Sequence, residues 1–469
     1  MRKIICFLLV LISIGFSISC ESNKVNYTPV KYDINIYCNE EEGMVYGDEC
    51  VTFTNDVSRE IDKIEFDLYQ IQIKTDKNGK LTDCGVKVVK VSDDYGSVDY
   101  ELSDDGGVLS VKLRKKLKKG QKISLYITFV TTLPAAAEKL GKTEEYINLC
   151  DFYPKVSFFD GKFHHYKQKD FGESRCDRAA DYSVKAKFNS KYVVCSSGKC
   201  ISTEIDDDCV VYNYQVNNAR GFAFTLSQNY SVLQKNVNGT LINYCYVSDA
   251  NPQKTFGIIE DCFAFFENVF CKYGYKIYTV AESEIKQNGV EQSCLSLVKN
   301  TGNFDVFTMT VVHETAHQWW YNMVGSDEFS FPYIDEALAE YSMTIFLKQY
   351  EKVVVNIDEY IDDGMKEFYY CKEFYIKENG KFDCSLSRNM DSFSSEYEYI
   401  SVVYRDGLYA FYSLDELTGG KKLIKELKDV CKKKKYDILS ENQLLDALRK
   451  RCGRGGEKYF KSFLKGKAV

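Results

Sequence analysis

Two histidines stand four residues apart in the segment Val312-His313-Glu314-Thr315-Ala316-His317. On a helix this spacing puts both imidazoles on one face, one turn apart, so that they can share a metal ion with Glu314 beside them. The alternative is an amphipathic helix that happens to carry two histidines. Because the whole chain has only four histidines, its composition disfavours an accidental pair, and the pattern predicts a zinc site.

A catalytic zinc ion needs a third protein ligand and one position left free for water. Glu336 is the candidate, because 18 residues separate it from His317, enough for one helix to end and a second to return antiparallel to it. The alternative for Glu336 is an exposed carboxylate on a helix. We therefore expect His313, His317 and Glu336 to bind one Zn²⁺ per chain.

The HExxH segment, the interval of 18 residues and the following Glu together resemble the gluzincin metallo-aminopeptidases related to aminopeptidase N. Gln318-Trp319-Trp320 follows the second histidine directly, and Asn288-Gly289-Val290-Glu291-Gln292 occupies the place of the family's G-x-M-E-N motif. Downstream, Tyr399 to Gly407 resembles the family's Y-x-x-x-x-Y-x-K-G stretch. Four short segments also resemble signposts of the family's N-terminal domain: Tyr32-Asp33-Ile34, Phe152-Tyr153-Pro154, Ala180-Asp181-Tyr182-Ser183-Val184 and Ala219-Arg220-Gly221-Phe222-Ala223.

The resemblance implies roles for four further residues. Glu314 would act as the general base that takes a proton from water and passes it to the leaving amine. Tyr404 would donate a hydrogen bond to the developing oxyanion. Glu291 would pair with the α-ammonium group of a peptide, and Gly289 would bind substrate in the same motif. These roles predict removal of one N-terminal residue at a time.

The sequence also departs from the family's pattern. Val290 and Gln292 replace the Met and Asn of the exopeptidase motif, Tyr321 replaces a Gly, and Arg405-Asp406 stand where the family has x-Lys. Larger family members continue with a helical domain that roofs the cleft, whereas 65 residues follow Tyr404 here. We therefore expect a more open site that tolerates longer peptides.

The hydrophobic pattern changes along the chain. From about Tyr27 to Ser231, short runs alternate with period two between clusters of Asp, Gly and Asn, which predicts an antiparallel β domain. After about Asn238, apolar residues recur at i, i+3 and i+4 over 256–270, 304–324, 333–350, 402–417 and 443–448, which predicts a mainly helical half. Gly419-Gly420 stands where a helix would end, and Ser440-x-x-Gln443 has the form of a capping box that opens the next helix. With the resemblance, this indicates an α+β protein: a signal peptide over 1–19, a saddle-like β domain over 20–232 and a thermolysin-like catalytic domain over 233–469.

The N-terminus has the form of an export signal. Arg2 and Lys3 precede an apolar run from Ile4 to Phe16, which is too short to span a bilayer comfortably. Cys20 follows a small-x-small segment and resembles the lipidated cysteine of bacterial lipoproteins, although Ser17 replaces the usual Leu. We expect an exported protein, secreted or held at the cell surface through Cys20.

Charge and cysteine content narrow the possible partners and bonds. The formal charge of −7 disfavours nucleic-acid binding, although residues 421–469 carry 16 Lys and Arg against 6 Asp and Glu. This basic end is interpreted as solvated helix faces, with contact to an anionic surface as the alternative.

Local disulfides among Cys195, Cys200 and Cys209 and between Cys262 and Cys271 are expected, with buried free thiols as the alternative.

The sequence as a whole predicts a zinc aminopeptidase that acts on peptides, with no nucleic acid and no obligate protein partner. A zinc endopeptidase on the same fold is the near alternative. The alternative from another class is a lapsed enzyme that binds peptides at the cell surface. The presence of His313, Glu314, His317, Glu336 and Tyr404 argues against that alternative.

Overall fold

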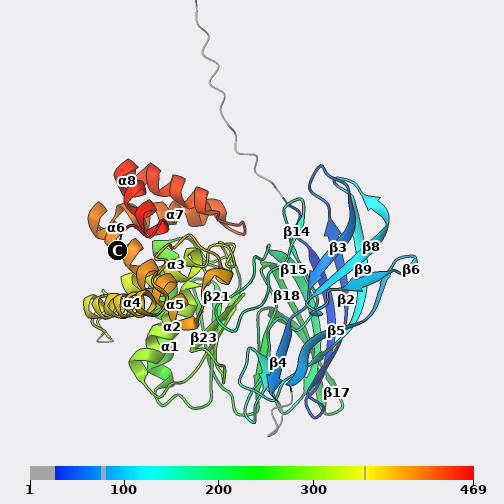
Figure 1. The fold of residues 1–469 in the computed structure, drawn as a ribbon. Helices are drawn as coiled ribbons and strands as arrows, with labels where there is room; N and C mark the ends of the chain where they lie inside the picture. Colours follow the sequence, from blue (N-terminus) through cyan, green and yellow to red (C-terminus); the bar gives the residue numbers. More distant parts are fainter. Residues whose placement is uncertain (1–26, 75–80, 353–354, 469) are drawn as a thin grey trace, which may run out of the picture.

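The computed structural model describes residues 27–74, 81–352 and 355–468. Figure 1 shows two parts side by side, a strand-rich part and a second part with a smaller sheet and helices. Every helix of eight residues or more that these residues form follows residue 251. The division agrees with the expected α+β fold, in which a β-rich half precedes a helical half.

The strand-rich part is built around a nine-stranded sheet in the order β17-β18-β15-β1-β2-β9-β5-β4, with β6 pairing with β5. Residues of β1 alternate between exposed and buried, as the period-two pattern predicts. Strands β1 and β15 pair in parallel, and the other neighbours are antiparallel. The strands are β1 (Lys31–Asn39), β2 (Met44–Thr54), β4 (Gln70–Lys74), β5 (Leu81–Asp93), β6 (Gly96–Ser97), β9 (Lys122–Thr132), β15 (Ala180–Asn189), β17 (Lys199–Asp206) and β18 (Cys209–Ala219).

Three smaller sheets complete this part, in the orders β12-β3-β8-β7, β10-β11-β19-β16 and β13-β14. Their strands are β3 (Ile61–Asp67), β7 (Tyr100–Leu102), β8 (Val108–Leu117), β10 (Leu140–Lys142), β11 (Ile147–Leu149), β12 (Lys155–Val156), β13 (Phe158–Phe159), β14 (Phe163–His164), β16 (Val193–Ser196) and β19 (Phe224–Ser227).

Aromatic residues from the four signpost segments meet in the core of this part. The rings of Tyr32 and Tyr182 stack with centroids 4.8 Å apart, and the ring of Tyr153 meets Tyr32 edge-on at 5.8 Å. Phe222 lies 6.1 Å from Tyr182. These segments are far apart in the sequence, so their aromatic contacts fix how the strands pack.

The second part contains a mixed five-stranded sheet in the order β20-β21-β22-β24-β23. Strands β21, β22 and β24 run parallel, and β23 forms an antiparallel edge. Helix α1 (Pro252–Val269) contacts β20 and β21, and helix α2 (Phe304–Ala316) contacts β23 and β24. The strands are β20 (Ser231–Val237), β21 (Thr240–Tyr246), β22 (Ile277–Glu282), β23 (Gly289–Gln292) and β24 (Leu295–Val298).

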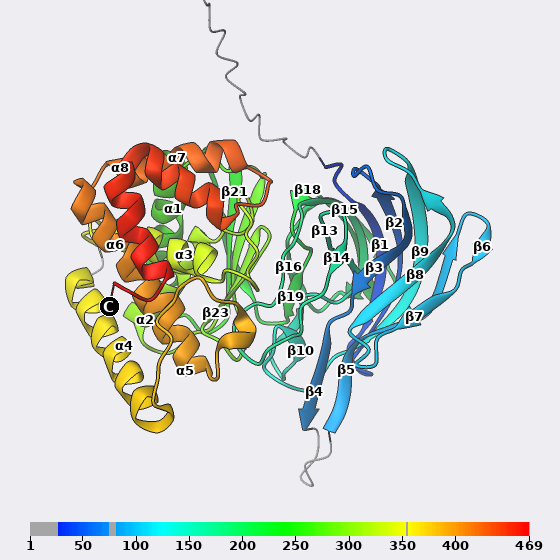
Figure 2. The same cartoon turned by 45° about the horizontal axis from the view of Figure 1, so that its top comes forward.

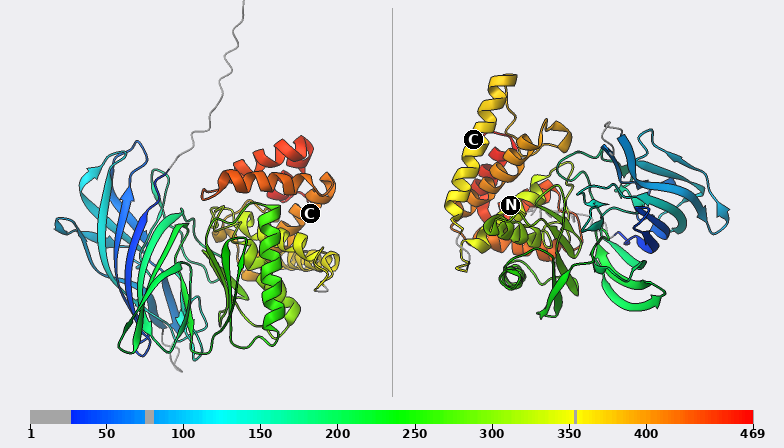
Figure 3. Two further views of the ribbon diagram at one scale, coloured as in Figure 1. Left: turned by 180° about the vertical axis from the view of Figure 1, so that it is seen from behind. Right: turned by 90° about the horizontal axis from the view of Figure 1, so that it is seen from below.

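The remaining helices pack beside this sheet, and Figures 2 and 3 show α7 and α8 lying together as an outer layer. Helix α6 ends at Gly419, which adopts the left-handed conformation (φ 86°), and the Ser440–Gln443 capping box opens α8, as the sequence predicts. The elements are α3 (Tyr333–Leu347), α4 (Ile357–Asn379), a 3₁₀ turn η1 (Met390–Ser392), α5 (Glu396–Tyr399), a π-helix η2 (Ile400–Asp406), α6 (Gly407–Thr418), α7 (Lys422–Lys434) and α8 (Glu441–Leu464).

The two parts pack directly against each other through Arg220, which is 1% exposed. Its guanidinium donates to the carbonyl oxygens of Tyr321, Asn322 and Asp437 in the second part. A Cβ on Gly325 would overlap this guanidinium, so glycine is required for the close approach. One buried cation from the strand-rich part therefore ties together the loop after α2 and the α7–α8 connection.

The disulfide prediction is wrong for Cys262 and Cys271. Cys271 is bonded to Cys431 on α7, and Cys262 is a buried free thiol. Cys262 and Cys271 are nine positions apart in a mostly helical segment, about 13 Å of rise, which exceeds the reach of a disulfide. Cys195, Cys200 and Cys209 are also free thiols. Among the residues that the structure describes, no helix combines the length and apolar character needed to cross a bilayer.

Candidate active site

Helix α2 positions the first two predicted zinc ligands. Its N-terminus is capped by Asn303, whose side chain accepts hydrogen bonds from the backbone of Asp305 and Val306. His313 lies in the last turn of α2 and His317 immediately follows the helix, so the four-residue spacing places both rings together. The ring centroids are 4.7 Å apart.

Helix α3 returns beside α2 and brings Glu336 to the two histidines. The Oε2 atom of Glu336 lies 3.3 Å from Nε2 of His313 and 3.4 Å from Nε2 of His317. The two Nε2 atoms are 3.0 Å apart. Three candidate ligand atoms therefore converge on one point, as the sequence predicts.

The second nitrogen of each histidine ring also lies close to an oxygen atom. Nδ1 of His317 lies 3.0 Å from the carbonyl oxygen of Trp320, and Nδ1 of His313 lies 3.0 Å from Oε1 of Glu340. Such contacts orient a ligating imidazole and turn its Nε2 toward the metal. Tyr360 in turn donates to the other oxygen of Glu340 at 2.9 Å.

The three side chains fit a zinc ion. Oε2 of Glu336 is buried without a hydrogen-bond partner, which is costly unless something else satisfies it. Burial would raise the pKa of Glu336, but the close approach of the His313 and His317 rings to its carboxylate holds that pKa well below its ordinary value. Two imidazoles and a carboxylate are the ligands of open zinc sites in hydrolases.

No other cluster of this kind is found in the described ranges, where His313, His317 and Glu336 are the one candidate metal-binding group. The adjacent His164 and His165 do not form a second one. His164 contacts Asp160, and His165 contacts two carboxylates of β3, so each is satisfied separately.

Glu314 follows the first ligand on α2 and is 4% exposed. Burial raises its pKa to about 8 against the opposing effect of His313 and His317. A Cβ on Gly289 would lie 2.7 Å from Cγ of Glu314, so this glycine leaves the space that the carboxylate fills. Gly289 thus contacts the predicted general base directly.

Glu291 lies on edge strand β23, beside α2, and is 5% exposed. The Arg175 guanidinium pairs with Glu291 through Nη2 and with Glu328 through Nε, the latter at 2.8 Å. Glu173 lies 3.7 Å from the same guanidinium. Burial raises the pKa of Glu291, and the Arg175 charge opposes that shift. Three carboxylates therefore surround one arginine at this end of the site.

Tyr404 lies on the π-helix η2, where the widened turn is typical of functional sites. Its ring is nearly parallel to the His313 ring, at 19° and 6.0 Å between centroids. Burial raises the pKa of Tyr404 well above its ordinary value, and Glu336 adds to the shift. A phenol beside the ligand set that keeps its proton is able to donate a hydrogen bond.

The predicted residues all line one cavity of about 520 Å³. Sequence reasoning missed two residues that support it, Arg175 and Glu340, because neither lies in a recognised motif. Glu340 has a local signal, its position four residues after Glu336 on the same face of α3. Arg175 has none, since it lies 116 positions before Glu291 in the sequence.

Solved structures with the same fold include zinc peptidases. The chain is similar to the M1 zinc metallopeptidase from Deinococcus radiodurans, with a TM-score of 0.69 and 14% identity over 94% of this chain and 95% of that one. A mutant of that organism's M1 enzyme gives 0.70 over the same shares, and a mutant bound to a Tyr-Ser-Ala substrate gives 0.69. At 14% identity this likeness shows the fold alone. Comparison with the curated proteins gives no match.

The fold and the convergent ligands are those of a two-domain zinc-peptidase architecture. Residues 255–465 match the model of the peptidase family M1 domain and include all the predicted site residues. The chain thus carries a peptidase family M1 domain and is a peptidase. The resemblance identified from its motifs is confirmed, and the expected zinc cofactor agrees with this match.

Proposed function

We propose that the protein is a zinc aminopeptidase that removes N-terminal residues from peptides. The observation that carries this proposal is the position of Glu291, a further buried carboxylate that lines the same cavity as His313, Glu314, His317 and Glu336. A carboxylate in that position suits the free α-ammonium group of a peptide and would place the first peptide bond over the metal ligands.

The cofactor is one zinc ion per chain, held by His313, His317 and Glu336. When bound, zinc lowers the pKa of a water molecule and polarises the scissile carbonyl. Glu314 accepts a proton at its carboxylate and returns it to the leaving amine, so one residue serves as base and then as acid. The Tyr404 hydroxyl donates a hydrogen bond to the oxygen on which negative charge develops.

The charge around Arg175 supports recognition of an amine. Glu291, Glu328 and Glu173 lie near one guanidinium, and Glu173 is also paired with Lys139 at 2.9 Å. Lys139 also lies 3.5 Å from Asp151, so the carboxylates beside Arg175 and Lys139 outnumber these two cations, which favours one more positive charge. Arg175 holds Glu291 in place, and a substrate ammonium would complete the network.

The test compares an unblocked peptide with its N-acetylated twin, using protein loaded with stoichiometric zinc. Release of single N-terminal residues from the unblocked peptide alone is expected, because acetylation removes the ammonium group. The Glu314→Gln variant should abolish that release, and Glu291→Gln should raise KM for the unblocked peptide. Internal cleavage of both peptides would make the protein an endopeptidase. Cleavage of neither would favour a peptide-binding role.

We also propose that the protein is exported and anchored in a membrane through lipidated Cys20. This proposal is supported by the apolar run and the residues before Cys20, which lie outside the described residues. Mass spectrometry of the mature N-terminus tests it. A chain that begins at a lipid-modified Cys20 is expected, and an unmodified chain that begins elsewhere would contradict the anchor.

A further inference from the structure

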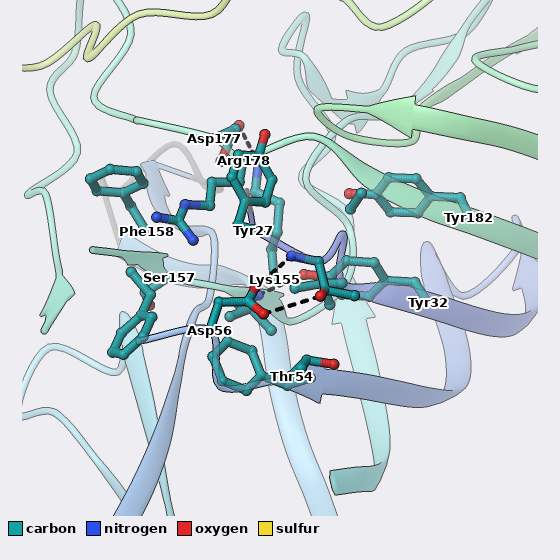
Figure 4. Close-up of a pocket in the computed structure, with 16 residues that line it drawn as sticks. Tyr27, Tyr32, Thr54, Asp56, Lys155, Ser157, Phe158, Asp177, Arg178 and Tyr182 are labelled. Atoms are coloured by element: carbon teal, nitrogen blue, oxygen red, sulfur yellow. Dashed lines mark hydrogen bonds and ion pairs between the residues drawn. The ribbon is translucent and has the colours of Figure 1, made fainter. Parts of the chain in front are cut away.

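The first described residues are fixed where the two parts of the molecule meet. The Tyr27 hydroxyl donates to the carbonyl oxygen of Tyr436 at 2.6 Å, and Arg178 lies over the Tyr27 ring at 4.5 Å. Thr28 donates through its hydroxyl to Asp56 at 3.1 Å. Tyr27, Arg178 and Asp56 line a pocket at this place, and Figure 4 shows them grouped around it. The point at which the chain enters the folded body is therefore defined.

Helix α7 ends close to this point, because Tyr436 follows the helix by two residues, and its exposed face is basic along its length. Its acidic residues do not neutralise that face, since Glu426 and Asp429 are paired with Arg451 of α8. The apolar residues of α7 face inward. Five lysines of α7 and its N-cap are exposed, and the ion pairs of the described chain leave them without a carboxylate: Lys421, Lys422, Lys425, Lys432 and Lys433.

A second basic cluster lies at the end of β8, on the strand-rich part. The turn after β8 contacts the N-terminal segment indirectly, because Gly120 donates to the Asn55 carbonyl oxygen at 2.7 Å and Asp56 binds Thr28. Figures 1 and 3 show this end of β8 and helix α7 on the same side of the molecule. Lys118 of this cluster lies 3.9 Å from Glu60, an ion pair between two largely exposed side chains. Four exposed lysines belong to this cluster: Lys115, Lys116, Lys118 and Lys119.

We propose that these two lysine clusters form one surface that binds the anionic phospholipid headgroups of a membrane. The anchor at Cys20, on which the orientation rests, is seven residues from Tyr27 and so at most about 25 Å away even when extended. Clustered lysines beside a lipid anchor are attracted to an anionic leaflet. Because the chain carries −7 overall, such attraction requires a local basic face rather than net charge.

The test measures sedimentation of the protein with unilamellar vesicles. The protein used begins at residue 20, ends at residue 469 and carries Cys20→Ser, so that no attached lipid contributes to vesicle binding. Sedimentation does not depend on peptide hydrolysis. The measured vesicle binding is therefore independent of whether Cys20 is lipidated and of whether the protein is an aminopeptidase. We expect binding to vesicles of equal parts phosphatidylcholine and phosphatidylglycerol, none to phosphatidylcholine alone, and release at high salt.

Two variants with the same change in charge test whether the vesicle-binding surface includes α7. Neutralising α7 with Lys421→Gln, Lys425→Gln, Lys432→Gln and Lys433→Gln should weaken binding at least about tenfold, with peptidase activity on a soluble peptide unchanged. The control is Lys199→Gln, Lys366→Gln, Lys377→Gln and Lys381→Gln, which alters exposed lysines on β17, on α4 and just after it. Binding that is indifferent to phosphatidylglycerol, or that falls equally in both variants, would overturn the proposal.

Discussion

Gly289 and Glu314 approach so closely that a Cβ on Gly289 would lie 2.7 Å from Cγ of Glu314 and nearer still to its carboxylate. The two residues come from different elements, edge strand β23 and helix α2. The glycine of the exopeptidase motif therefore has a steric role toward the HExxH helix, in addition to any contact with substrate.

This contact predicts the effect of Gly289→Ala. The added methyl group must displace the Glu314 side chain, so kcat should fall about a hundredfold, as for loss of a general base. Zinc content should stay stoichiometric, because the three ligands do not move. Gly257→Ala is the matched control, since no atom lies within 4 Å of a Cβ at that helical position. Unchanged kcat in Gly289→Ala would contradict the role of Glu314.

Glu340 predicts a change in zinc affinity. Glu340→Gln replaces the carboxylate that lies 3.0 Å from Nδ1 of His313, so zinc should bind about 10- to 100-fold more weakly. Competition with a chelator measures that affinity without reference to catalysis. Tyr360→Phe keeps the Glu340 carboxylate and removes only the hydroxyl that donates to it, so this variant should lose less zinc affinity than Glu340→Gln. Equal losses in both variants would refute the direct role of Glu340.

Tyr404 predicts a separate effect on turnover. Tyr404→Phe removes a hydroxyl and no ligand, so kcat should fall about 100- to 1000-fold while zinc affinity is retained. KM should change little if the hydroxyl acts only as charge develops. The control is Tyr369→Phe on α4, whose ring is 46% exposed. A variant that loses zinc along with activity would show that Tyr404 supports the metal site instead.

The site could be predicted from the sequence because its ligands obey local rules. The spacing of His313 and His317 follows helix geometry, and Glu336 needs only a second helix that returns. Glu340 and Arg175 escaped prediction because their roles depend on partners brought close by folding. Arg175 reaches Glu291 from a loop of the other part of the molecule.

The fold was predictable to a similar degree. Expected helices over 256–270, 333–350 and 443–448 correspond to α1, α3 and part of α8, but the expected helix over 304–324 ends at Ala316 as α2. The five-stranded sheet was not predicted there. Its strand Leu295–Val298 is buried on both faces, which removes the period-two signal. Helix α4 was missed because exposed aromatic residues such as Phe374 blur its apolar stripe.

The bond between Cys271 and Cys431 predicts a covalent contribution to stability. It joins the end of α1 to α7 across 160 residues of sequence, so Cys431→Ser should lower the free energy of unfolding by about 2 to 5 kcal/mol. Chemical denaturation of the oxidised protein measures this difference. Cys200→Ser is the control, because Cys200 is exposed and free. Peptide mapping that finds Cys271 as a free thiol would contradict the assignment.

Glu49 predicts a pH dependence of stability that arises far from the metal site. It lies on β2, is 3% exposed, and both its carboxylate oxygens lack a hydrogen-bond partner. Burial raises its pKa well above the ordinary value. The folded protein thus keeps a proton that the unfolded chain releases above about pH 4.3, so the free energy of unfolding decreases as pH rises from there toward the folded pKa.

Glu49→Gln removes this titration, and its stability relative to the wild type should increase between about pH 4 and pH 7. Urea unfolding across that range measures the difference, with Glu204→Gln on exposed strand β17 as the control. Wild-type and Glu49→Gln curves that stay parallel over the range would show that Glu49 is ionised in the folded protein.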